Sequence, residues 1–182
     1  GTLTLSGSNT YSGGTTISGG ALSISSESNL GATPSSATAN SLVLDGGTLK
    51  ATLGATGTTN AITLSANRGI TIGTGGGTID TASGVTLTAA GNIAANGNLT
   101  KSGTGTLTLG GGNAYAGGTS VLAGTLKIGN SLALGTGSAT VDDGATLDLN
   151  GFSVTSAPTL TLRGAGAGGA GALANSSSSA AS

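Results

Sequence analysis

Short runs in which an aliphatic residue alternates with Thr, Ser or Asp recur along the chain, separated by clusters of Gly, Asn and Ser. Thr2–Leu5 and Thr106–Leu109, both Thr-Leu-Thr-Leu, show this alternation clearly. A period of two is typical of β-strands that turn one face toward a core. No segment carries an apolar stripe of helical period over ten residues, and the density of glycine disfavours helices. The pattern therefore predicts an all-β chain of short strands.

The predicted strands are three to five residues long, with Leu, Ile or Val inward and polar side chains outward. They cover Thr2–Leu5, Thr15–Ser18, Ala21–Ser25, Ser41–Leu44, Thr48–Thr52, Ala61–Leu64, Gly69–Ile72, Thr78–Asp80, Val85–Thr88, Thr106–Leu109, Thr119–Leu122, Thr125–Ile128, Ala139–Val141, Thr146–Leu149, Phe152–Thr155 and Thr159–Leu162.

The chain also repeats itself at long range. Asn9–Thr15 returns 104 residues later as Asn113–Thr119, and after a change in length Gly46–Leu49 matches Gly144–Leu147 at an offset of 98. Internal repeats made of short strands are typical of stacked solenoids. We therefore expect repeat units at 1–54 and 105–151 with spacer coils between them, within a solenoid over 1–163. The Gly/Ala/Ser-rich segment 164–182 is expected to be a loop or a truncated further coil.

Composition favours a parallel β-helix over a β-sandwich. Aromatic residues make up 2% of the chain, which is too few for the thick core of a sandwich. In a β-helix each coil stacks its aliphatic residues on those of the next coil, so the narrow core needs no large aromatic side chain. With coils of about 20 residues, we expect roughly eight or nine coils.

Charge and residue content narrow the functional classes. Five basic and six acidic residues give a net charge of −1, so we expect no nucleic-acid partner. No apolar run approaches 18 residues, so we expect no transmembrane helix. The absence of His and Cys excludes Ser-His-Asp and Cys-His nucleophile systems. We expect no enzyme, no metal and no cofactor.

Three features leave other functions open. Asp142-Asp143 is the adjacent acidic pair, and the Gly144 that follows favours a turn over the carboxylates of a polysaccharide-processing enzyme. Tyr11 and Tyr115 could stack on carbohydrate, but packing at a coil corner is the simpler interpretation. Thr-x-Thr pairs suggest an ice-binding solenoid, yet the two Thr-Leu-Thr-Leu copies lie 104 residues apart, so the sequence shows no continuous array.

The run 99–109, followed by Asn113–Thr119, resembles the autotransporter-associated β-strand repeat (passenger-associated repeat) of bacterial surface proteins, and Gly1–Thr16 resembles it more closely. This resemblance implies a right-handed parallel β-helix in the passenger of an exported bacterial protein. Eight positions carry the repeat motif and are expected to be structural: Asn9, Tyr11, Gly13, Gly14, Asn113, Tyr115, Gly117 and Gly118.

Together these observations predict a non-catalytic structural or adhesive rod at the bacterial surface or outside the cell. We expect its partner to be a second copy, bound laterally or end to end into a fibre, or else surface glycans or a host surface. An ice-binding solenoid and a polysaccharide-processing β-helix enzyme are the alternatives.

Overall fold

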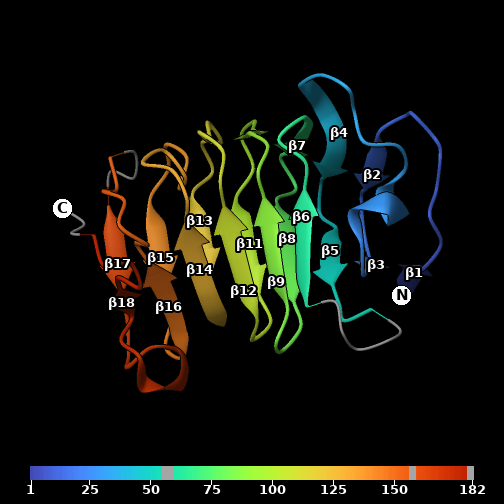
Figure 1. Ribbon diagram of the computed structural model, residues 1–182. Helices are drawn as coiled ribbons and strands as arrows, with labels where there is room; N and C mark the ends of the chain where they lie inside the picture. Colours follow the sequence, from blue (N-terminus) through green and yellow to red (C-terminus); the bar gives the residue numbers. More distant parts are fainter. Residues whose placement is uncertain (55–59, 156–158, 180–182) are drawn as a thin grey trace.

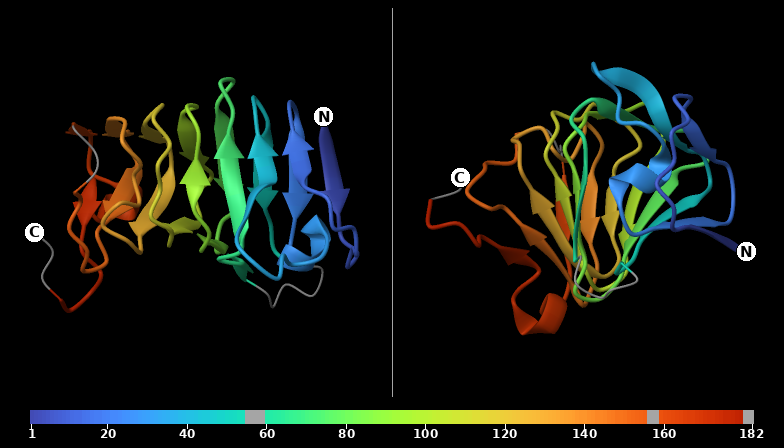
Figure 2. Two further views of the ribbon diagram at one scale, coloured as in Figure 1. Left: turned by 90° about the horizontal axis from the view of Figure 1, so that it is seen from above. Right: turned by 45° about the vertical axis from the view of Figure 1, so that its right-hand side comes forward.

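Figure 1 shows the computed structural model of the chain, which describes residues 1–54, 60–155 and 159–179. The strands stack along one axis and pair in parallel in three sheets, with the two ends of the chain at opposite ends of the stack (Figures 1 and 2). The largest sheet has eight strands, so the fold is a parallel β-solenoid of about eight turns. The predicted all-β solenoid is confirmed.

We name the three sheets A, B and C, and list their strands in stacking order. Sheet A contains β1 (Thr2–Leu5), β3 (Ala21–Ile24), β5 (Thr48–Ala51), β8 (Gly77–Thr81), β11 (Leu99–Ser102), β13 (Thr119–Val121), β15 (Ala139–Val141) and β17 (Leu160–Leu162). Sheet B contains β2 (Thr15–Ile17), β4 (Thr38–Leu44), β7 (Arg68–Ile72) and β10 (Ile93–Ala94). Sheet C contains β6 (Ala61–Leu64), β9 (Thr86–Ala89), β12 (Thr106–Leu109), β14 (Gly124–Ile128), β16 (Ala145–Asp148) and β18 (Leu173–Ala174). Two short 3-10 helices, η1 (Glu27–Leu30) and η2 (Ala167–Gly169), lie in the connections.

Aliphatic rows along the axis form the core. In sheet C, strand pairing places five inward residues side by side, and each is at most 3% exposed. They are Ile62, Leu87, Leu107, Leu126 and Leu147. Burying one such side chain contributes about 1.5–3 kcal/mol, so the stacked rows hold the coils together without large aromatic residues.

Most predicted strands are present with shifted ends, but three observed strands were not predicted. β10 has two residues, and β18 lies in the Gly/Ala/Ser-rich segment, where it pairs with β16. β11 contains Lys101, whose side chain points inward and interrupts the aliphatic alternation on which the prediction relied.

The predicted strand over Phe152–Thr155 is wrong. Asn150 and Gly151 have φ angles of 48° and 83°, so the chain turns immediately before this segment. Thr155 donates from both its backbone N and its Oγ1 to the carbonyl of Ser131, which lies in a connection and not in a strand. Among the described residues, β10 is the last strand of sheet B, so residues 152–155 have no strand of that sheet with which to pair.

Candidate functional site

The motif of the second repeat forms a corner between β12 and β13. Asn113 is 4% exposed and joins three successive coils through its amide. Its Oδ1 accepts from the backbone N of Ile93 at 2.8 Å, and its Nδ2 donates to the carbonyl of Ala133 at 2.6 Å. The Asn113 side chain thus supplies hydrogen bonds to two backbone groups, the N of Ile93 and the carbonyl of Ala133, which lie where no strand pairing can supply them.

Tyr115 fills the inside of the same corner and is fully buried. Its hydroxyl lies 2.6 Å from Oγ1 of Thr119, and its carbonyl accepts from the N of Thr136 at 2.9 Å. The ring lies against Gly135, where φ is +68° and a Cβ would come within 3.0 Å of the ring carbons. Burial raises the pKa of the Tyr115 hydroxyl, and the hydrogen bond with Thr119 acts in the opposite direction.

The first repeat makes part of this set of contacts. Asn9 Nδ2 donates to the carbonyl of Asn29 at 2.8 Å, and the hydroxyl of Tyr11 lies 2.9 Å from Oγ1 of Thr15. The N of Ala32 donates to the carbonyl of Tyr11 at 2.9 Å. Here, however, the corner is open to solvent, and Tyr11 is 40% exposed.

The paired glycines allow close approach of neighbouring backbones. A Cβ on Gly14 would lie 2.5 Å from the carbonyl oxygen of Asn40, and one on Gly118 would lie 2.6 Å from that of Ser138. A Cβ on Gly117 would lie 2.3 Å from a backbone carbon of the preceding coil, whereas one on Gly13 would meet nothing within 4 Å. Gly118 also has a φ of +93°, whereas Gly14 has no positive φ, so the equivalent glycines differ in backbone conformation as well as in surroundings.

The two corners also lie on different faces of the solenoid. The first connects β1 of sheet A to β2 of sheet B, and the second connects β12 of sheet C to β13 of sheet A. The motif thus specifies a corner and its contact with the next coil, but not the face on which it lies.

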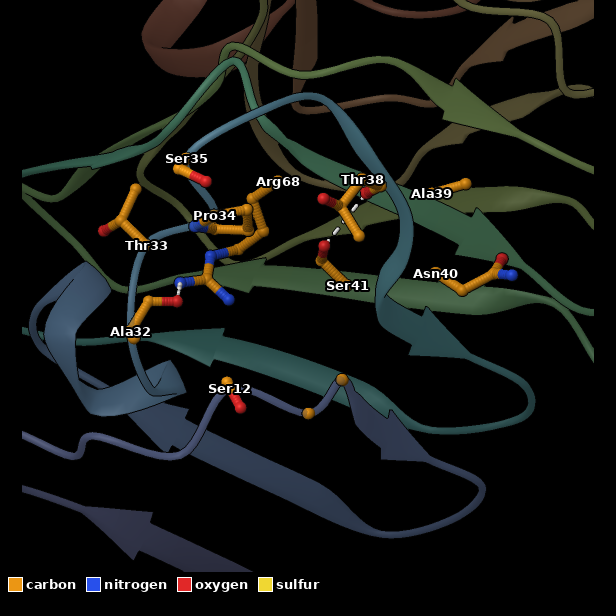
Figure 3. A pocket seen from close by; sticks show the side chains of 12 residues that line it. Ser12, Ala32, Thr33, Pro34, Ser35, Thr38, Ala39, Asn40, Ser41 and Arg68 are labelled. Atoms are coloured by element: carbon orange, nitrogen blue, oxygen red, sulfur yellow. Dashed lines mark hydrogen bonds between the residues drawn. The ribbon is translucent and has the colours of Figure 1, made fainter.

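A cavity of about 380 Å³ lies beside the first corner. Figure 3 shows Arg68 at its centre, with the segment containing Thr33, Pro34 and Ser35 on one side and the start of β4 on the other. Ser12 and the two glycines after it complete the lining.

Arg68 is 2% exposed and was not singled out from the sequence. Its Nε lies 3.2 Å from Oε1 of Glu27, and Nη1 donates to the carbonyl of Leu30 at 3.0 Å. Nη2 donates to the carbonyls of Gly31 at 3.4 Å and Ala32 at 3.2 Å. The guanidinium group therefore holds the turn after η1 against β7, and its charge is balanced by Glu27.

Lys101 is the second buried cation. Its side chain occupies the position of an aliphatic residue between Ile79 and Val121, and it is fully buried. Nζ donates to the carbonyls of Ser102 and Gly103, both at 2.6 Å, and to that of Ala123 at 3.1 Å. Burial lowers the pKa of Lys101 to about 8, although the Asp80 carboxylate acts to raise it.

The carboxylates are dispersed. Asp142 pairs with Arg163 at 2.9 Å, and the N of Ala145 donates to the Asp142 carbonyl, which closes the predicted turn at Gly144. Asp148 pairs with Lys127 at 3.2 Å. Within 1–54, 60–155 and 159–179, no three His, Cys, Asp or Glu side chains gather where they could hold a metal ion.

Outward threonines form rows that the long-range repeat did not reveal. Thr86 and Thr88 of β9 pair directly with Thr106 and Thr108 of β12. Thr125 of β14 extends the first row. The two Thr-Leu-Thr-Leu copies lie in different sheets, β1 in sheet A and β12 in sheet C. The threonine rows of sheet C arise because the Thr-x-Thr pair of β9, in the spacer coils, lies beside that of β12.

The family model of the passenger-associated-transport-repeat matches residues 1–24 and 99–128. Each matched segment contains one motif corner and ends in the second strand after it, β3 in the first segment and β14 in the second. Searches of curated proteins and of solved structures gave no match. Among the residues that the structure describes, no helix is long and apolar enough to cross a membrane. Two segments of the chain are therefore similar to the passenger-associated-transport-repeat.

Proposed function

We propose that this chain is a non-catalytic section of a stiff rod in the passenger of an exported bacterial surface protein. The observation that supports this most directly is the ladder of sheet A, in which every strand from β1 to β17 pairs in parallel with its neighbours. Such a ladder resists bending because each coil is bonded to the next along its whole strand. The two passenger repeats supply the link to export.

In this proposal the eight motif residues are structural. Asn9 and Asn113 bond adjacent coils where the strand ladder is interrupted, and the two tyrosines fill the corners beneath them. The glycines permit close contact between backbones. Catalysis has no part in the proposal, since Glu27, Asp142 and Asp148 are each engaged by a cation.

The rod acts at the cell surface by adhesion and by association with copies of itself. A net charge of −1 leaves little electrostatic repulsion between two rods. The outward faces of sheets A and C present Thr and Ser, which can form repeated weak hydrogen bonds to a polar surface. Glycans and a second copy are both partners of this kind.

Two measurements test the proposal. Small-angle X-ray scattering of the purified chain should give an elongated particle about 35–40 Å long, because eight strands stack at about 4.8 Å each. Labelling of intact producing cells with an antibody against the chain, followed by protease treatment, should show loss of surface signal without lysis. A compact particle would contradict the rod, and signal only after lysis would contradict surface exposure.

Ice binding is a second candidate, favoured by the threonine rows of sheet C. The side chains of Thr86, Thr88, Thr106 and Thr108 make no hydrogen bond to other described residues, so their hydroxyls are available to water. They form a grid of about 4.8 Å between strands and about 6.7 Å along each strand. Measurement of thermal hysteresis, with Thr106→Lys against Thr140→Lys on sheet A as the control, tests this candidate. A freezing point equal to the melting point in the unmodified chain would exclude it.

A further inference from the structure

The cavity beside the first corner exists because the two repeats differ in length there. Gly14 faces the carbonyl of Asn40 and Gly118 faces that of Ser138, so Asn40 and Ser138 are equivalent. Eight residues, 32–39, precede Asn40 after Gly31, whereas Thr136 and Gly137 alone fill the same place in the second repeat. The change of offset from 104 to 98 is thus an insertion of six residues at one corner.

The second corner has no room for a ligand. A Cβ on Gly137 would lie 2.4 Å from the backbone N of Gly118 and 2.5 Å from the carbonyl oxygen of Ala116. At the first corner, the inserted segment arches away from the neighbouring coils (Figures 1 and 2) and leaves about 380 Å³ beneath it. This volume lies at the lower end of the range for sites that bind small molecules.

The cavity walls combine Ser, Thr and Asn side chains with Gly, Ala and Pro, and their one charged side chain is that of Arg68. The hydroxyls of Ser12, Thr33 and Ser35 make no hydrogen bond to any other described residue. The side chain of Asn40 points away from Arg68 (Figure 3), and its Oδ1 accepts a hydrogen bond from the hydroxyl of Thr71. Hydroxyl groups both donate and accept, so these walls match a ligand that carries several hydroxyls of its own.

The charge balance selects a neutral ligand. Arg68 is the charged side chain that lines the cavity, and its charge is compensated by Glu27, which does not line the cavity. An anion would therefore gain little net attraction, and the lining contains no carboxylate that could hold a cation. Pro34 supplies an apolar surface against which the C–H face of a sugar ring can pack.

We infer that this cavity binds one neutral sugar residue of a surface glycan. The inference rests on the adhesive part of the proposed function and names its ligand class. Because the site is half open and lacks an aromatic platform, we expect a dissociation constant of about 1 mM for a single sugar. Useful attachment then requires many rods engaging one surface at once.

The test uses saturation-transfer-difference NMR of the whole chain with glucose, galactose, mannose and N-acetylglucosamine, and with sialic acid as the anionic comparison. Two variants remove the site: Ser12→Leu, which fills the cavity, and replacement of residues 32–39 by Thr-Gly, which copies the second corner. Ala116→Leu places the same bulk at the equivalent position of the second repeat, where there is no cavity. Circular dichroism and scattering establish that each variant keeps the rod.

We expect at least one neutral sugar to bind, with affinity at least tenfold weaker in both site variants and unchanged in Ala116→Leu. Absence of binding by any neutral sugar would overturn the inference, as would equal binding after replacement of residues 32–39. Binding of sialic acid alone would also overturn it and would assign the cavity to anions through Arg68. Scattering tests the rod separately, so loss of sugar binding from an intact rod refutes the site and not the rod.

Discussion

The two motif corners share several hydrogen bonds but have different surroundings. In both, Asn bonds to the next coil, and Tyr bonds to the Thr four residues later. Tyr115 is fully buried between coils, whereas Tyr11 is 40% exposed. This difference in burial indicates that the motif residues specify the shape of the corner. The coils stacked on the corner determine how much each residue contributes to stability.

The largest expected effect is removal of the tyrosines. Tyr115→Ala should lower the free energy of unfolding by about 4 kcal/mol, because it leaves a cavity within the stack. Tyr11→Ala should cost about 1–2 kcal/mol, since less apolar surface is buried there. Urea unfolding followed by circular dichroism measures both. Equal losses would show that the hydrogen bonds, and not the burial, determine the contribution of the corner.

The glycines of the two corners differ in how closely they approach a neighbouring backbone. Gly117→Ala should destabilise by about 3 kcal/mol, because its Cβ would lie 2.3 Å from the backbone of the preceding coil. At Gly13 a Cβ would meet nothing within 4 Å, so Gly13→Ala should change stability by less than about 0.5 kcal/mol. The midpoints of thermal unfolding of the two variants provide the comparison. If Gly117→Ala proved neutral, the close packing of these coils would be contradicted.

Much of this fold could be predicted because aliphatic alternation determines which side of a strand is buried. The rows through Leu87 and Leu107 follow directly from that pattern. Lys101 and Arg68 could not be predicted as inward-facing residues, because each depends on a partner from another coil: the carbonyl of Ala123 for Lys101 and the carboxylate of Glu27 for Arg68. Sequence around a residue does not reveal partners that lie a full coil away.

The candidate sites also differ in how far they could be predicted from the sequence. The motif positions could be found from the repeat because their contacts recur with the same spacing in both copies. The threonine grid could be recognised only from the register between β9, which lies in a spacer coil, and β12, which lies in the second repeat. The cavity was visible in the sequence only as a change of offset, and Arg68, which lies at its centre, comes from the following coil.

The asparagines provide a smaller contrast between the corners. Asn113→Ala should cost about 2 kcal/mol, because it leaves the buried N of Ile93 without a partner and removes the shorter of the two side-chain hydrogen bonds to the carbonyl of Ala133. Asn9→Ala should cost about 0.5–1 kcal/mol, because solvent can replace the lost bonds. Urea unfolding measures the loss of stability, and amide hydrogen exchange at Ile93 tests whether that amide has lost its hydrogen bond. Unchanged protection of that amide in Asn113→Ala would contradict the proposed bond.

The smallest expected effect concerns Lys101, which ties the coil before the second corner to the coil after it. Below pH 8 both the folded and the unfolded chain hold the proton of this ammonium group, so its contribution does not change with pH. The pKa of Lys101 is lowered from 10.5 to about 8 in the folded chain. Between these values the unfolded chain binds more protons than the folded chain, and stability contributed by this group therefore rises with pH.

Lys101→Met removes this titration while keeping the inward position apolar. The variant leaves the carbonyls of Ser102, Gly103 and Ala123 without their donor, so its absolute stability is less informative than its pH profile. Tyr115 acts in the opposite direction above about pH 10, because its pKa is raised by burial and the unfolded tyrosine ionises first. Urea midpoints from pH 7.5 to 9.5 therefore isolate the lysine. The stability of the unmodified chain, taken relative to that of Lys101→Met, should rise across this window, and a flat difference would mean that the ammonium group keeps its ordinary pKa despite its burial.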